Sequence, residues 1–418
     1  MSDYKAYYKG EPIEFDLPSG WTVIGVGEPK SAAPLTNVRA ELQRVLEHPT
    51  NTKSITSLAS SAKNAVIICD DQTRPTPANQ LLPVIIDLLN SSGITDSRVN
   101  VVVGRGTHRR PTDEEVKLKV GGEVFDRVDV AVHEPDEKRA LKYIDVSSKG
   151  TPIWINRNVA EADLKIGVGN IAPHYFAGYG GGGKIILPGV SGRETIVKNH
   201  VMIRDPNTIQ GKLEENIIYT DMREVARKVG LDMKVDVILN MANELAGISA
   251  GEVGFEHKRG IKMFNDIYGF RPPRQADITI TCGYPLESNL IQSNKAVMSA
   301  DLVTKKGGII ILVSACYDGA GHGFYETLRE RPEPEEVIDW MATGKAQPSG
   351  GPVANRVRGI LKTKTVAVVT NGVSHDKLEE MEMTPFSTLE AALKEISRSR
   401  KTAEVMVLPA GSSINPML

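Results

Sequence analysis

Short apolar runs, each followed by a polar loop and a helical segment, recur along the first half of this 418-residue chain. Four of these runs indicate strands, at 65–69, 99–103, 128–132 and 164–168. Brief runs that are apolar throughout are typical of strands buried on both faces. The order strand, loop, helix, strand predicts an α/β fold with a mainly parallel sheet wrapped by helices.

A second series of strands follows a stiff break at 271–274, where the sequence is Arg-Pro-Pro-Arg. A chain this long exceeds what one core usually serves, so we expect two α/β domains. The N-terminal domain should span residues 1–270 and be completed by 402–418. The C-terminal domain should span 271–401, with hinge helices at its ends, one of them at 388–400. We expect the cofactor and substrate site in the crevice between the domains.

Charge and composition narrow the range of partners and compartments. The formal net charge of -2 gives no reason to expect nucleic acid or an anionic membrane as a partner. No apolar run approaches the roughly 18 residues of a membrane span, and the first residues do not resemble a signal peptide. The three cysteines, Cys69, Cys282 and Cys316, are widely spaced at the ends of apolar runs. Small buried thiols are common at such places, so we expect a cytoplasmic protein.

The stretch after the strand at 164–168 carries a concentration of unusual residues. Four consecutive glycines, at 180–183, precede Lys184, with His174 before them and His200 after them. Glycines let the main chain approach a ligand closely and point its N–H groups at it. Ser191 and Glu194 predict a capping box that starts the helix carrying His200, and Thr112 and Glu115 predict a second capping box that starts the helix after the strand at 99–103. A flexible surface loop is the simpler alternative, but ordinary loops use one or two glycines, so a cofactor site is favoured.

Neither of two common nucleotide-binding patterns is complete in this chain. Gly178, Gly183 and Lys184 satisfy G-x-x-x-x-G-K, but Ile185 stands where a P-loop requires Ser or Thr for magnesium. The residues after Lys184 are also unlike the helix of a P-loop. No G-x-G-x-x-G follows the first strand, which argues against a dehydrogenase with diffusible NAD.

Polar side chains follow three of the predicted strands at the points where the strands end. Asp71 and Arg74 follow the first, His108 follows the second, and His174 with Lys184 follows the fourth. In open α/β sheets, ligands bind at the carboxyl ends of the strands. The three groups therefore indicate one common crevice.

Five short motifs, in their order and spacing, resemble those of the nickel-dependent lactate racemase family. They are DQTRP at 71–75, GTH at 106–108, PH at 173–174, GK at 183–184 and NH at 199–200. The resemblance extends to the second domain, where Gln292 and Lys295 stand in the corresponding helix. The family uses a nickel-pincer nucleotide, which is a pyridinium-3-thioamide-5-thiocarboxylic acid mononucleotide with Ni(II).

The resemblance implies which residues bind this cofactor. Lys184 would attach it through a thioamide, and His200 would be the protein ligand to nickel. Imidazole is a chemically reasonable ligand for Ni(II) beside soft donors. Gly182, Gly183 and Asp71 would complete the cofactor-binding set, with Asp71 helping to position the cofactor or the nearby arginine.

The resemblance also implies the substrate-binding and catalytic residues. His108 and His174 would act as alternating base and acid on opposite faces of a 2-hydroxy acid. Arg74 and Lys295 would hold its carboxylate, and Gln292 would form a hydrogen bond with it. The pKa of about 6.5 of a free histidine suits proton transfer in both directions near neutral pH.

The implied reaction is racemisation or epimerisation at C2 by reversible hydride transfer to the cofactor, through a 2-oxo acid. The implied partners are a small 2-hydroxy acid and the enzymes that make the cofactor. Two alternatives stay open: a nucleotide-dependent enzyme, P-loop-like or NAD-using, and a non-catalytic carrier of nickel or cofactor. The carrier leaves the paired histidines and Arg74 unexplained. The other histidines are expected on the surface or in loops, at His48, His133, His257, His322 and His375.

Overall fold

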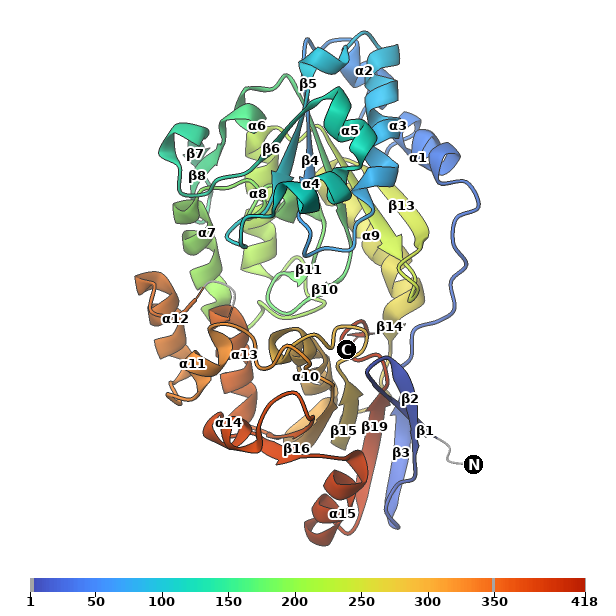
Figure 1. The fold of residues 1–418 in the computed structure, drawn as a ribbon, viewed down its shortest axis with the longest axis vertical. Coiled ribbons are helices and arrows are strands. Elements are labelled where there is room, and N and C mark those ends of the chain that lie inside the picture. The colour runs from blue at the N-terminus through green and yellow to red at the C-terminus, as the bar shows by residue number, and fades with distance from the viewer. Residues whose placement is uncertain (1–3, 348–349, 418) are drawn as a thin grey trace. The chain divides into compact units, whose positions relative to one another are not determined.

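The computed structural model describes residues 4–347 and 350–417. The described chain divides into two compact units. Unit 2 consists of Ser31–Ala172 and Phe176–Ile267, and unit 1 contains the residues before and after this span together with Pro173–Tyr175. Each unit is built on a six-stranded sheet with flanking helices (Figure 1). The predicted α/β class with mainly parallel sheets is confirmed.

Unit 2 is organised around a sheet with the strand order β13-β12-β9-β4-β5-β6. These strands are β13 (Leu245–Gly251), β12 (Met233–Leu239), β9 (Leu164–Asn170), β4 (Ala65–Asp70), β5 (Val99–Gly104) and β6 (Asp129–Val132). All neighbouring pairs are parallel except β12 and β13 at one edge. The carboxyl ends of β9, β4, β5 and β6 therefore share one edge of the sheet, as the sequence predicts.

The helices of unit 2 follow these strands in the expected alternation. They are α1 (Val38–Glu47), α2 (Ile55–Ala59), α3 (Ala78–Ser91), α4 (Asp113–Val120), α5 (Gly122–Arg127), α6 (Arg157–Glu161), α7 (Arg193–His200), α8 (Ile217–Val229) and α9 (Val253–Tyr268). A hairpin of β7 (Leu141–Val146) and β8 (Pro152–Asn156) and a short turn of 3-10 helix, η3 (Gly182–Ile185), complete the parts used below.

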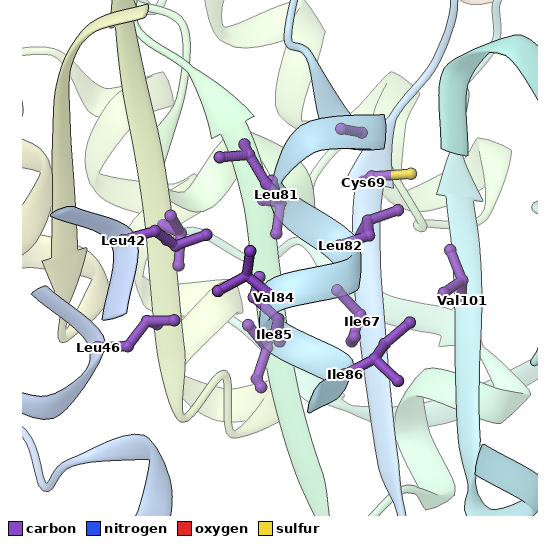
Figure 2. Close-up of a cluster of buried hydrophobic side chains, with 14 of the residues drawn as sticks. Leu42, Leu46, Ile67, Cys69, Leu81, Leu82, Val84, Ile85, Ile86 and Val101 are labelled. Carbon is purple, nitrogen blue, oxygen red and sulfur yellow. The ribbon is translucent and has the colours of Figure 1, made fainter. Parts of the chain in front are cut away.

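One face of this sheet carries a hydrophobic core that includes α1, α2 and α3 (Figure 2). Side chains alternate along a strand, so Ile67 and Cys69 of β4 point to this face together with Val101 of β5. Leu81 and Ile85 of α3 pack against them and are fully buried. Burying each such aliphatic side chain stabilises the fold by roughly 1.5–3 kcal/mol. The opposite face is where η3 packs, against β4, β9 and α8.

Two helix starts were predicted from capping boxes, and one of them is confirmed. Thr112 accepts from the amide of Glu115, whose side chain accepts in turn from the amide of Thr112, so α4 begins as expected. The capping box at Ser191 and Glu194 is wrong. The Ser191 hydroxyl donates instead to the carbonyl of Ile186, 2.8 Å away, and α7 begins after Gly192 without a side-chain cap.

Unit 1 is organised around a fully parallel sheet with the strand order β18-β17-β16-β15-β19-β3. The strands are β18 (Thr384–Phe386), β17 (Thr365–Val369), β16 (Thr304–Val313), β15 (Ala276–Cys282), β19 (Ala403–Leu408) and β3 (Trp21–Val26). Its helices are α10 (Leu290–Val303), α11 (Phe324–Leu328), α12 (Pro334–Thr343), α13 (Gly351–Leu361), α14 (His375–Glu380) and α15 (Leu389–Ser399). Hydrophobic clusters cover both faces, one including α10 and α13 and the other including α15 and the hairpin of β1 (Tyr4–Tyr8) and β2 (Glu11–Phe15).

The predicted assignment of both chain ends to the N-terminal domain is wrong. Strand β19 lies between β15 and β3, so residues 402–418 complete the sheet of unit 1, and the strand near the N-terminus joins the same sheet. The helix expected at 388–400 is α15, and it leads directly into β19 of its own unit. It is therefore not a hinge between domains. Ile267 is the last residue of unit 2, four residues before the predicted break at 271–274.

The three cysteines are buried and free, as expected. No helix in the described part of the chain combines the length and the apolar character needed to span a membrane.

Candidate functional site

The loops after β4 and β5 bring two of the predicted site residues into direct contact. Asp71, the first residue after β4, is 1% exposed, and its Oδ2 lies 2.7 Å from Nδ1 of His108. His108 follows β5 and keeps 38% of its side chain exposed. Its Nε2 has no protein partner within the residues described. The pair therefore consists of a buried carboxylate behind an imidazole with one free nitrogen.

The carboxylate of Asp71 is ionised at neutral pH. Burial acts to raise its pKa, but hydrogen bonds from His108 and Thr73 and the positive charges nearby outweigh this, so the pKa is lowered. An ionised carboxylate accepts a hydrogen bond from the N–H group at Nδ1 of His108. This fixes the tautomer in which Nε2 has a lone pair and acts as a base.

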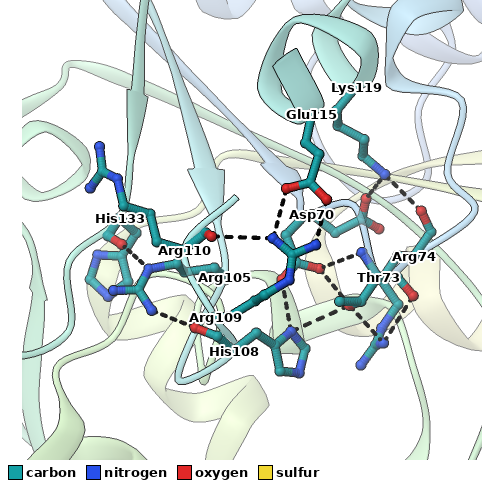
Figure 3. A network of polar contacts seen from close by, with 11 residues as sticks. Asp70, Thr73, Arg74, Arg105, His108, Arg109, Arg110, Glu115, Lys119 and His133 are labelled. Atoms are coloured by element: carbon teal, nitrogen blue, oxygen red, sulfur yellow. Dashed lines mark hydrogen bonds and ion pairs between the residues drawn. The ribbon is translucent and has the colours of Figure 1, made fainter. Parts of the chain in front are cut away.

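Thr73 connects Asp71, His108 and Arg74. Its hydroxyl lies 2.5 Å from Oδ1 of Asp71 and 3.3 Å from Nδ1 of His108. The guanidinium of Arg74 donates to the same hydroxyl over 3.1 Å. Figure 3 shows these contacts as one continuous network. The sequence motif contains Thr73, but its role as the common partner of three side chains was not predicted.

A buried lysine, also not predicted, holds this loop through hydrogen bonds to its backbone (Figure 3). Lys119 of α4 donates to the carbonyls of Arg74 and Thr76, over 3.0 and 2.9 Å, and its Nζ lies 2.6 Å from Oδ1 of Asp70. Its side chain is only 7% exposed. A lone buried charge is costly, whereas this one is paired and hydrogen-bonded. Lys119 therefore holds the backbone on both sides of Pro75.

Arg105 performs a similar role for the loop after β5. Its guanidinium donates to the carbonyls of His108 and His133 and forms an ion pair with Glu134 at 2.6 Å. The loop is also tied to the segment after η3, because the amide of Gly106 donates to the carbonyl of Gly189 over 2.9 Å. The turn that carries His108 is thus connected to the segment that carries Lys184.

Lys184 and His200 meet around one aromatic ring. The Nζ of Lys184 lies 5.2 Å from the centroid of the Phe176 ring, and the imidazole of His200 packs edge-on against the same ring at 5.0 Å. Lys184 lies in η3 and His200 is the last residue of α7, so the tertiary structure brings them together. Phe176 was not predicted; the only sequence signal for it is an aromatic residue next to the predicted His174 segment.

The electrostatics of this pair favour metal binding by His200. Burial, and then the charge of Lys184, lower the pKa of His200 to about 3, so its imidazole is neutral at physiological pH. Its Nδ1 is buried and has no hydrogen-bond partner among the described residues. A neutral imidazole is the form that binds metals.

The glycine run does not present its amides in the way the sequence predicted. The amides of Gly180 and Gly182 donate to the Ala172 carbonyl and to the Asp236 carboxylate, both over 2.7 Å. A Cβ atom on Gly182 would lie 2.6 Å from the His257 ring, and one on Gly183 would lie 2.7 Å from the carbonyl of Met222. The glycines are therefore required for packing against the protein interior, and the Gly182 amide has a partner within the protein.

The remaining predicted site residues lie in unit 1. Gln292 and Lys295 are on α10, three positions apart and hence on one side of the helix, and both are partly exposed. The cap of this helix is Asn289, whose side chain accepts from the amide of Gln292. His174 is in β10 (Pro173–His174), and its ring stacks on that of Tyr175 at 4.9 Å.

Of the histidines predicted to be on the surface or in loops, His133 lies in a loop, as expected, and is buried there, whereas the prediction is wrong for His257. His133 is 0% exposed and lies 2.9 Å from the Ser191 carbonyl, and His257 is 1% exposed and lies in α9. Burial lowers the pKa of both, that of His133 to about 4. His48, His322 and His375 are exposed, as predicted.

Comparison with known proteins covers both units. The protein-family model of the lactate racemase N-terminal domain matches residues 8–211. The family model of the lactate racemase C-terminal domain matches residues 272–415. The lactate racemase of Thermoanaerobacterium thermosaccharolyticum is 32% identical over 425 residues, with 99% of each chain covered. That of Lactiplantibacillus plantarum is 32% identical over 382 residues, with 89% of each covered.

Solved structures agree with this result. The lactate racemase apoprotein from Thermoanaerobacterium thermosaccharolyticum superimposes with a TM-score of 0.90 at 31% identity, covering 99% of both chains. A protein from Thermotoga maritima, at 17% identity, shares the fold with a TM-score of 0.64 over 92% of this chain and 99% of its own. The resemblance inferred from five short motifs is confirmed: the chain belongs to the lactate racemase family and is an isomerase with racemase activity.

Proposed function

We propose that this racemase inverts the C2 centre of a 2-hydroxy acid with a nickel-pincer nucleotide attached to Lys184. The observation that carries the proposal is the meeting of Lys184 and a neutral His200 around Phe176. An amine suited to covalent attachment stands beside an imidazole suited to nickel, in the unit that also holds the Asp71–His108 pair.

These residues fit the proposed cofactor. Lys184 would form the thioamide, and His200 would ligate nickel through a ring nitrogen. Only one protein ligand is required for this cofactor, and the described residues contain no group of three or more His, Cys, Asp or Glu side chains that could hold a metal ion by themselves. When bound, the cofactor supplies a hydride acceptor, which lets C2 pass through a 2-oxo acid and avoids removal of a weakly acidic C2 proton.

The side chains of the protein would handle the proton and the carboxylate. Nε2 of His108 would take the hydroxyl proton of one enantiomer, while Asp71 holds the ring and stabilises the imidazolium that forms. His174 would serve the other enantiomer, because the hydroxyl points to the opposite side. Arg74, with the planar donor fork of its guanidinium, would bind the substrate carboxylate.

Gln292 and Lys295 would contribute further hydrogen bonds and charge to the same substrate. The relatives are named for lactate, so lactate is the first substrate to test, followed by a panel of other 2-hydroxy acids. The enzymes that synthesise and insert the cofactor would be the partners of this chain, in the reducing cytoplasm that the free cysteines suit.

The attachment is tested by Lys184→Arg, which keeps the positive charge but cannot form a thioamide. The protein is produced together with the cofactor-synthesis enzymes, and its intact mass, nickel content and racemase activity are measured. We expect the wild type to carry a mass increase that maps to Lys184, and the variant to lack it along with most of the nickel. The matched control is Lys198→Arg, at an exposed position of α7, which should keep the adduct. A wild-type protein made in this way without an adduct at Lys184 would contradict the proposal.

A further inference from the structure

Four titratable side chains are buried behind the glycine run and have no role in the proposed reaction. They form what we call the buried cluster: Lys234 and Asp236 of β12, and Glu256 and His257 of α9. Each is at most 1% exposed. Burying an ion pair costs several kcal/mol of desolvation per ion, and apolar residues of similar volume often stabilise a fold as well or better. Stability alone therefore does not explain the cluster.

The sequence of β9 makes room for the ion pair. Lys234 and Asp236 pair in register with Gly167 and Gly169, so the two larger side chains stand beside two strand positions without side chains. A Cβ on Gly169 would lie 3.3 Å from both Nζ of Lys234 and Oδ1 of Asp236. The Lys234 ammonium and the Asp236 carboxylate form an ion pair at 2.5 Å.

Two members of the buried cluster hold the glycine run directly. Oδ2 of Asp236 accepts from the amide of Gly182 at 2.7 Å, and Nε2 of His257 donates to the carbonyl of Gly180 at 2.8 Å. Gly181 and Gly182 have φ values of 82° and 52°, a region that side chains disfavour. A Cβ on Gly181 would lie 2.8 Å from Oδ2 of Asp236. The backbone on the N-terminal side of Lys184 is therefore fixed from one side by a donor and an acceptor.

The charges within the buried cluster balance. Burial, and then the nearby Asp236 charge, raise the pKa of Glu256 well above its ordinary value, so this carboxyl group is neutral. Burial lowers the pKa of His257, which is also neutral. Its proton is on Nε2, the atom that donates to Gly180. Lys234 and Asp236 are thus the two members of the buried cluster that form an ion pair, and the carboxylate of this pair accepts from the Gly182 amide.

We propose that the buried cluster is a positioning site for Lys184: it fixes Gly180–Gly182 so that the lysine emerges beside Phe176 and His200, where the cofactor is attached. Its members are positioning residues, since they act through the backbone. What is attached to Lys184 rests on the proposed function. The holding of the loop does not, because it depends only on contacts within this chain.

The main test compares two double variants that both remove the buried charges. Lys234→Met with Asp236→Asn keeps an oxygen that can accept from the Gly182 amide, whereas Lys234→Met with Asp236→Leu has none. Each is produced with the cofactor-synthesis enzymes, and the fraction of chains with an adduct at Lys184 is read from the intact mass. Hydrogen exchange of the peptide covering 178–186 is measured on protein made without those enzymes. Urea unfolding shows whether both variants fold cooperatively.

We expect both double variants to fold, and the leucine variant alone to lose the fixed loop. Its loop amides should exchange about tenfold faster or more, because the buried Gly182 amide is left without an acceptor, and its adduct fraction should fall by a similar factor. The asparagine variant should stay near the wild type in both measurements. Equal loading and equal exchange in the two double variants would overturn the proposal.

A second pair of variants decides the matter if the double variants do not fold. His257→Gln keeps an N–H donor for the Gly180 carbonyl and His257→Leu removes it, and neither changes the charge. The leucine variant should show the faster exchange and the lower adduct fraction. Equal values for this pair would overturn the proposal. If wild-type protein itself carries no adduct, the proposed function fails, and the exchange comparison still tests whether the buried cluster holds the loop.

Discussion

Oδ2 of Asp71 lies 2.7 Å from Nδ1 of His108, which leaves Nε2 as the one ring nitrogen of His108 without a protein partner among the described residues. The carboxylate is buried and the imidazole is partly exposed, so the pair combines a fixed orientation with access for a ligand. Thr73, whose hydroxyl lies close to both, restricts the ring further.

Asp71→Asn should impair catalysis while preserving the fold. The asparagine side chain has the same size, but only one of its two polar atoms accepts a hydrogen bond. It also carries no negative charge, so it does not stabilise a protonated His108. We expect kcat for racemisation to fall on the order of a hundredfold, the lower end of general acid–base contributions. The measurement is initial rates from each enantiomer, with the Lys184 adduct quantified on the same samples. Full loading with a rate within about threefold of the wild type would refute the role given to Asp71.

Adjacent glycines of the run should tolerate alanine very differently. A Cβ on Gly180 would have its nearest neighbour at 3.6 Å, whereas Gly181 has φ of 82° and a Cβ there would lie 2.8 Å from Asp236. We expect Gly181→Ala to lower the free energy of unfolding by about 1–3 kcal/mol, and Gly180→Ala to change it by less than about 0.5 kcal/mol. Urea unfolding of the protein without cofactor measures both. Similar losses at the two positions would show that the run is not packed as described.

His133 should make the protein less stable below neutral pH. Its pKa is about 4 in the folded state, because of burial, and about 6.5 in the unfolded chain. Between these values the unfolded state binds more protons, so the stability that is present above pH 6.5 is lost as the pH falls toward 4. From pH 7 to pH 5, this single group should lower the free energy of unfolding by about 2 kcal/mol.

His133→Gln tests this expectation, because glutamine retains a donor for the Ser191 carbonyl but does not titrate. Chemical unfolding of the variant and the wild type at pH 7 and pH 5 gives the four free energies required. The decrease in the free energy of unfolding from pH 7 to pH 5 should be smaller in the variant than in the wild type by about 2 kcal/mol. An equal loss in both proteins would mean that His133 is protonated in the folded state or accessible to water.

Racemisation in D2O separates hydride transfer from proton transfer at C2. A hydrogen that moves as hydride does not exchange with water during turnover, so the inverted product should keep the original C2 hydrogen. His108 and His174 would handle only the hydroxyl proton, whose exchange leaves no trace at carbon. The mass of the inverted product at early turnover is the measurement. Substantial deuterium at C2 would exclude the proposed mechanism, even in an enzyme that carries nickel.

The sequence by itself determined several of the buried strands and the place of several site residues. The strands at β4, β5 and β9 are short apolar runs that need burial on both faces, and this requirement is local. Asp71, Arg74 and His108 were located correctly because the carboxyl ends of parallel strands meet at one edge. The capping box at Thr112 was predictable because it is also local: its two hydrogen bonds join Thr112 and Glu115, which lie within four residues of chain.

Only the tertiary structure decided which strands pair, which polar groups are buried and where the glycine run faces. The sequence does not indicate that β3 and β19 lie side by side, because any apolar strand of similar length satisfies the same local pattern. From the sequence alone, Lys234 and Asp236 would be taken for solvated residues. Only the pairing of β12 with β9 places them beside Gly167 and Gly169. Glycine permits close approach but does not specify the partner. Packing between residues far apart in the chain decides what the glycines contact. In this protein the glycine run forms hydrogen bonds with Asp236 and His257.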